Sequence, residues 1–438
     1  MTNASNVAQP PGGRAVARGG QLYRLIWKWH FLAGLLVLPF MAFMAVTGIV
    51  NLFHDDLTEM LYSDRLNVPV GEQRRAYQDI AAAVSAEAPG RISKVFVPEA
   101  EGRSYTFEVS DKAGQVTMAW ADPYTGEVLG RADKDTMVLN FIERAHASFT
   151  AGLTGRLVNE ALTSWSIVMF LTGLYLWWPR GSRRWANVLS LPKGEGRPWW
   201  RSLHLLVGGF GVILVIPLMF SGLFWSPIWG DAYLKSQLAM KHFSPAVAYG
   251  GPPIFNKSAE GEVMSLDQLI TVAREAGLKG DLEARPPVAP KFGILIRTVE
   301  STPVPDQVEL HVDTRSGEVM RRAVYDHYPP MAWFRSMMAR LHVGSLWGTW
   351  SVVLNLVAAL SIVVLSVSGF AAWWARRPAG SLGVPAGPKS AKLGAGLAVL
   401  VLALAVFMPA MGLTLIVALC LDWLIFRRMG WFQPSNAV

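Results

Sequence analysis

The chain has 438 residues, of which 52% are hydrophobic and only 16% are charged. So little charge cannot cover a soluble surface, and the composition predicts a lipid-facing exterior. The net charge of +8 does not indicate nucleic-acid binding, because the basic residues lie beside apolar runs, as topology signals and lipid-headgroup contacts do. The single cysteine, Cys420, lies in an apolar segment, which excludes a disulfide framework, a cysteine zinc site and a cysteine-ligated iron–sulfur cluster.

The first predicted elements are a tail and a membrane anchor. Residues 1–23 open with a polar, basic stretch rich in Gly, Ala and Pro, which predicts a disordered cytoplasmic tail. The apolar run that follows is too long for a signal-peptide core and lacks a small-residue cleavage site, so it is expected to remain as an uncleaved anchor. Six segments are apolar enough to cross a bilayer, which takes about 20 residues. They are approximately residues 32–53, 161–178, 205–225, 351–374, 393–411 and 413–426, the last being short and containing Asp422.

These segments predict an α-helical integral membrane protein built from a duplicated unit of helix, α+β domain and helix, followed by a C-terminal helical hairpin. The expected parts are a tail over 1–23, a first span over 24–54, a first domain over 55–140, a second span over 141–180, a cytoplasmic loop over 181–201, a third span over 202–228, a second domain over 229–333, a fourth span over 334–376, a second cytoplasmic loop over 377–392 and a terminal hairpin over 393–428.

Basic residues set the expected orientation. They cluster before the first span and after the second, fourth and sixth, which is one side of the membrane if every segment crosses. By the positive-inside rule that side is the cytoplasm. We therefore expect a bacterial inner-membrane protein with both termini in the cytoplasm and two periplasmic domains. The residues concerned are Arg14, Arg18, Arg24, Lys28, Arg180, Arg183, Arg184, Lys193, Arg197, Arg201, Arg376, Arg377, Lys389, Lys392, Arg427 and Arg428.

An internal repeat supports this organisation. The first and third spans match at an offset of 174 (204 − 30), and the second and fourth match at 196 (342 − 146). Small residues at matched places fit close helix–helix contact. The first set pairs His30, Gly34, Thr47 and Gly48 with His204, Gly208, Ser221 and Gly222. The second pairs Arg144, His146, Gly152, Asn159, Thr172, Gly173, Trp177, Trp178 and Arg180 with Arg340, His342, Gly348, Asn355, Ser368, Gly369, Trp373, Trp374 and Arg376.

Two of the four repeated histidines are expected near the cytoplasmic boundary. Each of His30 and His204 is followed four residues later, on the same helical face, by a glycine, Gly34 or Gly208. A position without a side chain one turn away lets a flat macrocycle lie against the backbone. Two such histidines would supply both axial ligands of one haem iron.

His146 and His342 form the second predicted pair, on the periplasmic side. A straight helix from either histidine to its Trp pair, 31 residues on (177 − 146), would run about 46 Å, beyond a hydrocarbon core of about 30 Å. We therefore expect both histidines at or above the interface, on short helices broken near Gly152 and Gly348. Arg144 and Arg340, two residues before them, either pair with haem propionates or mark the membrane interface.

Simpler interpretations compete with haem ligation. Single histidines often anchor helix ends at an interface, but four in matched pairs favour ligation. A metal other than haem ranks lower, because no paired carboxylates, cysteines or HxxxH spacing complete a zinc or copper shell. The other histidines, His54, His242, His311 and His327, lack a partner pattern and are interpreted as solvated, with His54 kept as a reserve ligand for the periplasmic iron.

Several motifs resemble the PepSY-associated transmembrane family over about residues 24–378. They are the basic-aromatic stretch before His30, Thr47-Gly48, Arg144-x-His146 and the Thr172–Arg180 run, together with the turns Asp122–Val128 and Asp313–Val319, which resemble the last hairpin of PepSY domains. The resemblance extends to inner-membrane, haem-dependent ferric siderophore reductases of the ferrioxamine-reductase type. It implies b-type haem held by membrane histidines and reduction of a ferric siderophore in the periplasm. The terminal hairpin lies outside the pattern.

The expected function is therefore electron transfer across the membrane through two haem b groups, one at each histidine pair. The expected partners are a ferric siderophore, the lipid bilayer and a separate electron donor, with no nucleic acid. The donor is a cytoplasmic reductase or a quinol, because the chain shows no fused nicotinamide or flavin domain and no GxGxxG after a strand. Two alternatives stay open: a non-enzymatic PepSY regulator or binding module, and a di-haem subunit that feeds another periplasmic reductase. No acid–base catalytic residue is expected.

Overall fold

The computed structural model describes residues 11–180, 185, 191–192, 194–246, 254–258, 260–299, 302–385, 395–421 and 424. The chain divides into two compact units, each described here by itself. The membrane unit contains Met1–Val46, Ala151–Trp229 and Val357–Val438, and the sheet unit contains Thr47–Thr150 and Gly230–Leu356. Several residues used for the expected orientation and for the last span lie outside the described residues: Arg183, Arg184, Lys193, Lys389, Lys392, Asp422, Arg427 and Arg428.

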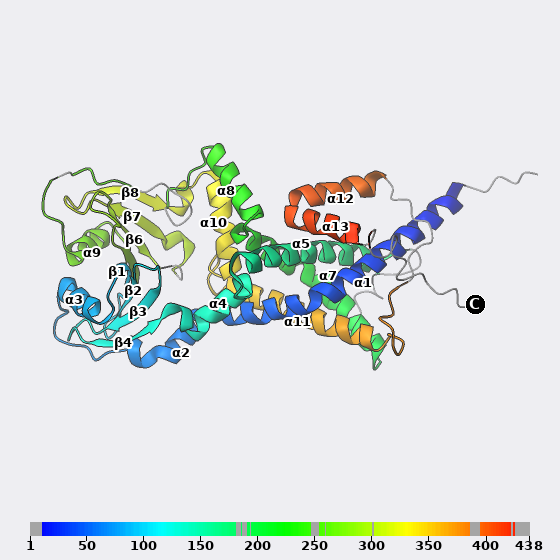
Figure 1. Cartoon of the computed structure of the whole chain (residues 1–438), viewed down its shortest axis with the longest axis horizontal. Coiled ribbons are helices and arrows are strands. Elements are labelled where there is room, and N and C mark those ends of the chain that lie inside the picture. The colour runs from blue at the N-terminus through cyan, green and yellow to red at the C-terminus, as the bar shows by residue number, and fades with distance from the viewer. Residues whose placement is uncertain are drawn as a thin grey trace, which may run out of the picture. The chain divides into compact units, whose positions relative to one another are not determined.

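Four described helices are long and apolar enough to cross a membrane (Figure 1). They are α1 (Pro11–Leu52), α5 (Gly152–Trp177), α7 (Arg197–Gly222) and α11 (Thr349–Trp374). A helix of 26 residues is about 39 Å long, enough for a hydrocarbon core of about 30 Å. Their inward side chains, such as Val37, Val215 and Ile362, form one core, while many large apolar side chains face outward, as lipid-facing helices require.

The first helix begins earlier than expected. Residues 11–23 belong to α1 instead of forming a disordered tail, and residues 1–10 lie outside the described part. Proline is tolerated in the first turn of a helix, where its missing N–H is not needed. Extending an existing helix costs less than nucleating a new one, whereas the four glycines of residues 11–20 disfavour a helix.

Six crossings are not confirmed. Within the described residues, α12 (Ala395–Phe407) and α13 (Pro409–Leu421) have 13 residues each, about 20 Å, and the residues next to them, 391–394 and 422–423, lie outside the described part. They form a tight hairpin beside α5 (Figure 1), in which Trp165 donates its indole N–H to the hydroxyl of Thr414 at 2.9 Å. Phe407 stacks on Phe220 of α7. Over the described residues the terminal hairpin therefore packs against α5 and α7.

The two segments between the long helices build a single antiparallel sheet. The strand order is β4-β3-β2-β1-β5-β6-β7-β8, so the two domains expected over 55–140 and 229–333 are halves of one sheet. The halves join where β1 pairs with β5, with Val95 opposite Ala284. This pairing satisfies backbone groups that each half alone would expose at an edge. The strands are β1 (Arg91–Val97), β2 (Tyr105–Ser110), β3 (Val116–Ala121), β4 (Val128–Asp133), β5 (Leu282–Arg285), β6 (Ile294–Thr298), β7 (Val308–Val312) and β8 (Val319–Val324).

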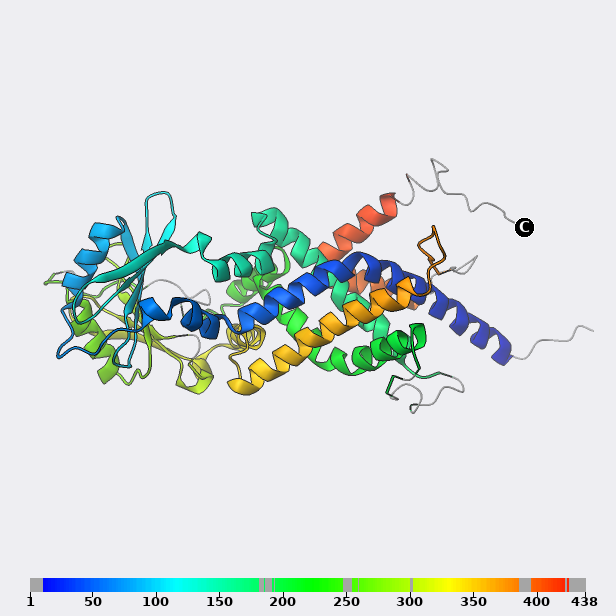
Figure 2. The same ribbon diagram turned by 90° about the horizontal axis from the view of Figure 1, so that it is seen from below.

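Two helices cover one face of this sheet. They are α3 (Tyr77–Glu87) and α9 (Leu266–Glu275), and their apolar residues share a core with every second strand residue, including the fully buried Phe107 and Ile296. The sheet unit also contains α2 (His54–Leu66), α4 (Val138–Ser148) and α10 (Pro330–Val343), and α8 (Trp229–Ala239) begins at its boundary (Figure 2).

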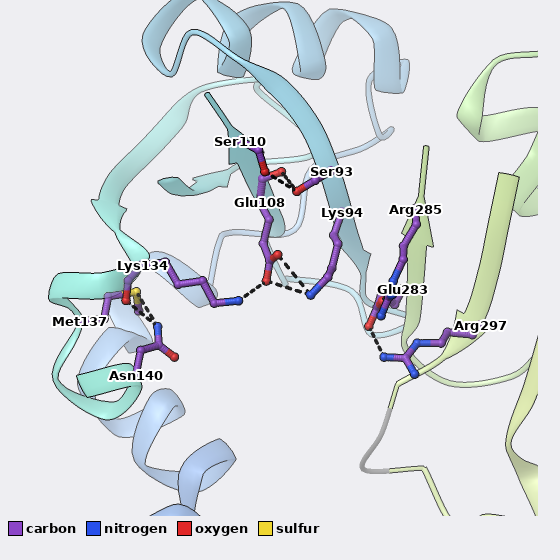
Figure 3. Close-up of polar contacts among 10 residues, drawn as sticks. All are labelled: Ser93, Lys94, Glu108, Ser110, Lys134, Met137, Asn140, Glu283, Arg285 and Arg297. Atoms are coloured by element: carbon purple, nitrogen blue, oxygen red, sulfur yellow. Dashed lines mark hydrogen bonds and ion pairs between the residues drawn. The ribbon is translucent and has the colours of Figure 1, made fainter. Parts of the chain in front are cut away.

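The opposite face of the sheet carries paired charges (Figure 3). Glu108 of β2 accepts hydrogen bonds from Lys94 of β1 at 3.2 Å and from Lys134 at 2.7 Å. In the second half, Arg297 of β6 donates to Glu283 of β5 at 2.8 Å. Burial raises the pKa of Glu283, but Arg297 and its other arginine neighbour outweigh burial and hold it below its usual value. The two halves thus place an ion pair on equivalent pairs of strands. The carboxylate lies on β2 in the first half, but on β5, the equivalent of β1, in the second half.

The Asp-x-x-x-Gly-Glu-Val motif closes equivalent turns in the two halves. In each turn the glycine has positive φ, +77° at Gly126 and +72° at Gly317, and donates its N–H to the carbonyl of the aspartate. The carboxylate of Asp313 accepts four backbone N–H groups, from Lys257, Ser258, Arg315 and Ser316. The motif is therefore a turn-forming device, which explains its repetition without a ligand.

Candidate cofactor site: the repeated histidines

His30 lies on α1 and is oriented by α5. Its Nδ1 atom lies 3.1 Å from the hydroxyl oxygen of Thr172. That hydroxyl donates its own hydrogen to the carbonyl of Met169 at 2.9 Å, so its oxygen is left to accept from Nδ1–H of the histidine. The imidazole is thereby held in one tautomer, and Nε2 keeps its lone pair for a ligand.

His204 on α7 has the equivalent relation to α11. Its Nδ1 lies 3.2 Å from the carbonyl oxygen of Leu365 and 3.3 Å from the hydroxyl oxygen of Ser368. A carbonyl can only accept, so Nδ1 must carry the hydrogen, and Nε2 is again the unprotonated nitrogen. Because Thr172 and Ser368 are repeat equivalents, the duplicated sequence produces the same contact twice.

A glycine follows each hydroxyl residue and makes room for the ring. A Cβ atom placed on Gly173 would lie 3.1 Å from Cε1 of His30, and one on Gly369 would lie 3.2 Å from Cε1 of His204. Such contacts are tighter than ordinary van der Waals packing. The Thr-Gly and Ser-Gly pairs therefore combine two tasks, since the hydroxyl orients the imidazole and the glycine admits it.

The sheet unit contains the same arrangement at His146 of α4. Its Nδ1 lies 3.0 Å from the hydroxyl oxygen of Thr47, and a Cβ on Gly48 would lie 3.1 Å from its Cε1. The imidazole of His342, on α10, faces it with the ring centres 6.2 Å apart and the planes inclined by 52°. The structure thus brings together the two histidines that the repeat pairs.

The expected helix breaks before the second and fourth spans are confirmed. α4 ends at Ser148 and α5 begins at Gly152, where the backbone has φ of +55°. α10 ends at Val343, and Gly348 (φ +57°) directly precedes α11. Asn355 of α11 donates its amide to the carbonyls of Leu341 and His342 at 2.7 and 3.1 Å. These bonds satisfy carbonyls that the end of α10 leaves open.

The separation of His146 and His342 can be compared with axial ligation of one metal ion. An imidazole nitrogen lies about 2.0–2.1 Å from a bound first-row metal and about 1 Å from its own ring centre, so two coaxial ligands have ring centres about 6 Å apart. The observed 6.2 Å agrees with that geometry. The donor set also fits, because two imidazoles are the axial ligands of bis-histidine haem, and Nδ1 of His146 lies against the hydroxyl of Thr47.

The predicted glycine and arginine residues have protein neighbours. A Cβ on Gly34 would meet Sδ of Met169 at 3.5 Å, and one on Gly208 would meet Leu365 at 3.4 Å, so both glycines face an adjacent helix. Arg144 pairs with Asp135, with Nη1 and Oδ1 3.0 Å apart. Arg340 is buried, bonds to Gln307 and Ser336 and lies over the ring of Tyr325.

The remaining histidines differ from one another. The prediction of a solvated side chain is wrong for His311, which is buried on β7 and bonds to Glu309 at 2.9 Å, because the paired charges of this sheet face are covered. His327 is exposed and His242 is half-buried. Asp55, 3.5 Å away, raises the pKa of His54 through a hydrogen bond, so the reserve ligand has a carboxylate neighbour of its own. Among the described residues, no three His, Cys, Asp or Glu side chains cluster as a metal site would require.

The model described as the PepSY-associated TM region matches residues 27–376, which is 350 of the 438 residues (376 − 27 + 1). The chain belongs to the PepSY-associated transmembrane family. The family match includes all four repeated histidines and ends before α12 and α13. No curated protein matches the chain.

The family match also contains residues whose role the sequence alone did not reveal. The repeat identifies Thr47, Thr172 and Ser368 as matched small residues and predicts helix–helix contact for them. In this member of the family their hydroxyls instead lie against histidine Nδ1 atoms. The sequence contained a sign of this role. Each hydroxyl residue is followed by a glycine, and each belongs to a repeat pair with the same offset, 174 or 196, as a pair of histidines.

Proposed function

We propose that this protein transfers electrons across the bacterial inner membrane through two b-type haems and reduces a ferric siderophore in the periplasm. The observation that supports this most is the repeated histidine–hydroxyl–glycine arrangement at His30, His204 and His146. Each of these histidines is held through Nδ1, which leaves Nε2 for an axial bond. An anchoring role at the interface would not require such orientation at matched positions.

The ligand pairs follow the repeat. His30 and His204 would hold one haem near the cytoplasmic surface, and His146 and His342 would hold the second near the periplasmic surface. A b-type haem with two histidine ligands supplies one-electron transfer and has no open position on iron, which suits relay and not oxygen activation. The hydroxyl residues keep the imidazoles in the tautomer that can ligate.

Reduction serves to release iron. One electron converts a ferric chelate to a ferrous one, and the oxygen ligands of a siderophore bind the softer ferrous ion far more weakly. The protein need not move protons or form covalent bonds for this step, so no acid–base residue is required. A separate donor, a cytoplasmic reductase or a membrane quinol, would reduce the haem of His30 and His204.

Haem stoichiometry tests the proposal. Purified wild-type protein should contain two b-type haems, and His→Ala changes at 30 or 204 should empty one site while changes at 146 or 342 empty the other. His327→Ala is the matched control, because that histidine is exposed and unpaired with the others. A colourless protein after expression with ample haem would support the non-enzymatic regulator instead.

A second experiment tests the substrate. Dithionite-reduced protein, freed of excess reductant, should be reoxidised by a ferric hydroxamate siderophore. A chromogenic ferrous chelator should then detect one ferrous ion for each haem that is oxidised. If both haems are present but stay reduced, direct siderophore reduction is wrong, and the chain is better explained as a di-haem subunit of another reductase.

A further inference from the structure

A cavity of about 310 Å³ lies in the sheet unit between α3, α9 and the adjoining ends of β1 and β2. The first half of the sheet contributes Arg74, Tyr77 and Tyr105, and the second contributes Leu266 and other residues of α9. In Figures 1 and 2, α3 and α9 lie at the end of the sheet unit opposite α4 and α10, which carry His146 and His342. The cavity is therefore separate from the histidine pair.

Two arginines and two carboxylates line the cavity, so their formal charges balance, but only one arginine forms an ion pair with a carboxylate of the lining. Arg274 pairs with Glu99, with nitrogen and oxygen 3.6 Å apart, and Asp267 accepts the backbone N–H of Tyr77 at 2.9 Å. Arg74 instead donates to the backbone carbonyls of Pro98 and Ala100, at 3.4 and 3.2 Å. Within the described residues no carboxylate forms an ion pair with it. Carbonyls fix the direction of the guanidinium without forming an ion pair with it.

Two phenols and an apolar floor complete the lining. Tyr105 is buried and lies beneath the guanidinium of Arg74, 5.9 Å from ring centre to Cζ, and Tyr77 stacks on Phe107. Burial raises the pKa of both tyrosines, so their hydroxyls remain protonated donors at neutral pH. Val97 and Leu266 are buried and supply apolar surface.

The duplicated sheet shows that these polar groups are particular to one half. β2 and β6 begin at Tyr105 and Ile294, and α3 and α9 begin at Tyr77 and Leu266, both 189 positions apart (294 − 105 and 266 − 77). The same offset relates Arg74 to Val263 (263 − 74). An arginine and two tyrosines thus replace three aliphatic residues of the other half. A purely structural junction between similar halves would not need this substitution.

We propose that this cavity binds a small amphipathic carboxylate. The guanidinium of Arg74 takes the carboxylate, the phenol hydroxyls donate to its oxygens, and the apolar floor accepts an aliphatic or aromatic tail. The cavity lies at the lower end of the size range for small-molecule sites, about 300–1,000 Å³, which favours a ligand with one ring or a short chain. This site is independent of haem binding and of siderophore reduction.

Binding of N-acetylphenylalanine to the full chain in nanodiscs, measured by saturation-transfer NMR, tests the proposal. We expect saturable binding to the wild type, and binding weaker by roughly tenfold or more for the neutral N-acetylphenylalanine amide, as loss of one charge-assisted contact predicts. Arg74→Gln should weaken binding of the acid to the level of the amide. Arg91→Gln, at an exposed position at the start of β1 that does not line the cavity, is the matched control and should bind as the wild type does.

Three results would overturn the proposal: no saturable binding to the wild type, equal binding of acid and amide, or wild-type binding by Arg74→Gln. The comparison of acid with amide needs no variant, so it decides the matter even if Arg74→Gln fails to fold. Haem content measured on the same samples should be unchanged in Arg74→Gln, which separates this result from a failure of the electron-transfer proposal.

Discussion

The hydroxyl oxygen of Thr172 lies 3.1 Å from Nδ1 of His30, although the two residues are 142 positions apart in the chain. The relation recurs between His204 and Ser368 and again between His146 and Thr47. A hydroxyl that orients an imidazole is a common partner of a metal-ligating histidine.

Removal of the hydroxyl should weaken one haem site selectively. Thr172→Val keeps the shape of the side chain but removes the acceptor for Nδ1–H of His30. Loss of such a partner typically reduces affinity about 10–100-fold, so haem should dissociate more readily from this site than from the other. Haem titration by absorbance provides the measurement. Thr163→Val, elsewhere on α5, is the matched control, and equal haem affinity in the two variants would argue against an orienting role for Thr172.

Added bulk at the neighbouring glycine should displace the imidazole. The Cβ of Gly173→Ala would lie 3.1 Å from Cε1 of His30, so the ring must shift by a few tenths of an ångström. We expect reduced occupancy of that haem or a changed low-spin EPR signal. Gly396→Ala on α12 has no neighbour within 4 Å and serves as the control. An unchanged EPR spectrum and full occupancy in Gly173→Ala would contradict this expectation.

Two variants test whether His342 or His54 is the second ligand beside His146. His342→Ala should abolish the haem held with His146. The two ring centres lie 6.2 Å apart, so each histidine would supply one of the two axial ligands. His54→Ala should retain it, since that imidazole lies beside Asp55. Haem stoichiometry distinguishes the variants. The reverse outcome, with haem lost only in His54→Ala, would make His54 the ligand.

Asp313 should confer acid-sensitive stability on the sheet unit. Its burial raises the pKa, but backbone N–H donors from Ser258, Arg315, Ser316 and Lys257 outweigh this and lower it from 3.8 to about 2. A depressed carboxyl pKa stabilises the fold above pH 3.8, and this contribution is lost as the pH falls towards 2. At pH 7, Asp313→Asn should therefore be less stable, by on the order of 1–2 kcal/mol.

The thermal midpoints of the wild type and Asp313→Asn, followed by circular dichroism from pH 7 to pH 2, give this comparison. The difference should be largest near neutrality and should shrink below pH 4. A constant difference over the whole range would show that the variant acts through packing. Asp111→Asn, in an exposed turn of the first half, is a suitable control.

The fold was predictable where the pattern is local. Long apolar runs predicted the four spanning helices, and the distance from His146 to its Trp pair predicted the break near Gly152. Long-range packing decided other features. The two predicted domains join through β1 and β5, and His311 is buried, because strand pairing depends on partners that hydropathy does not identify.

For the candidate site, the sequence by itself determined which histidines are equivalent, because duplication leaves fixed offsets in the chain. It did not determine what each histidine touches. Only the tertiary structure decided that His30 meets Thr172 and that Gly173 admits its ring, since α1 and α5 are distant in the sequence and adjacent in the fold. The direction of an imidazole is set by its hydrogen-bond partners and packing neighbours, and these exist only once the helices have packed.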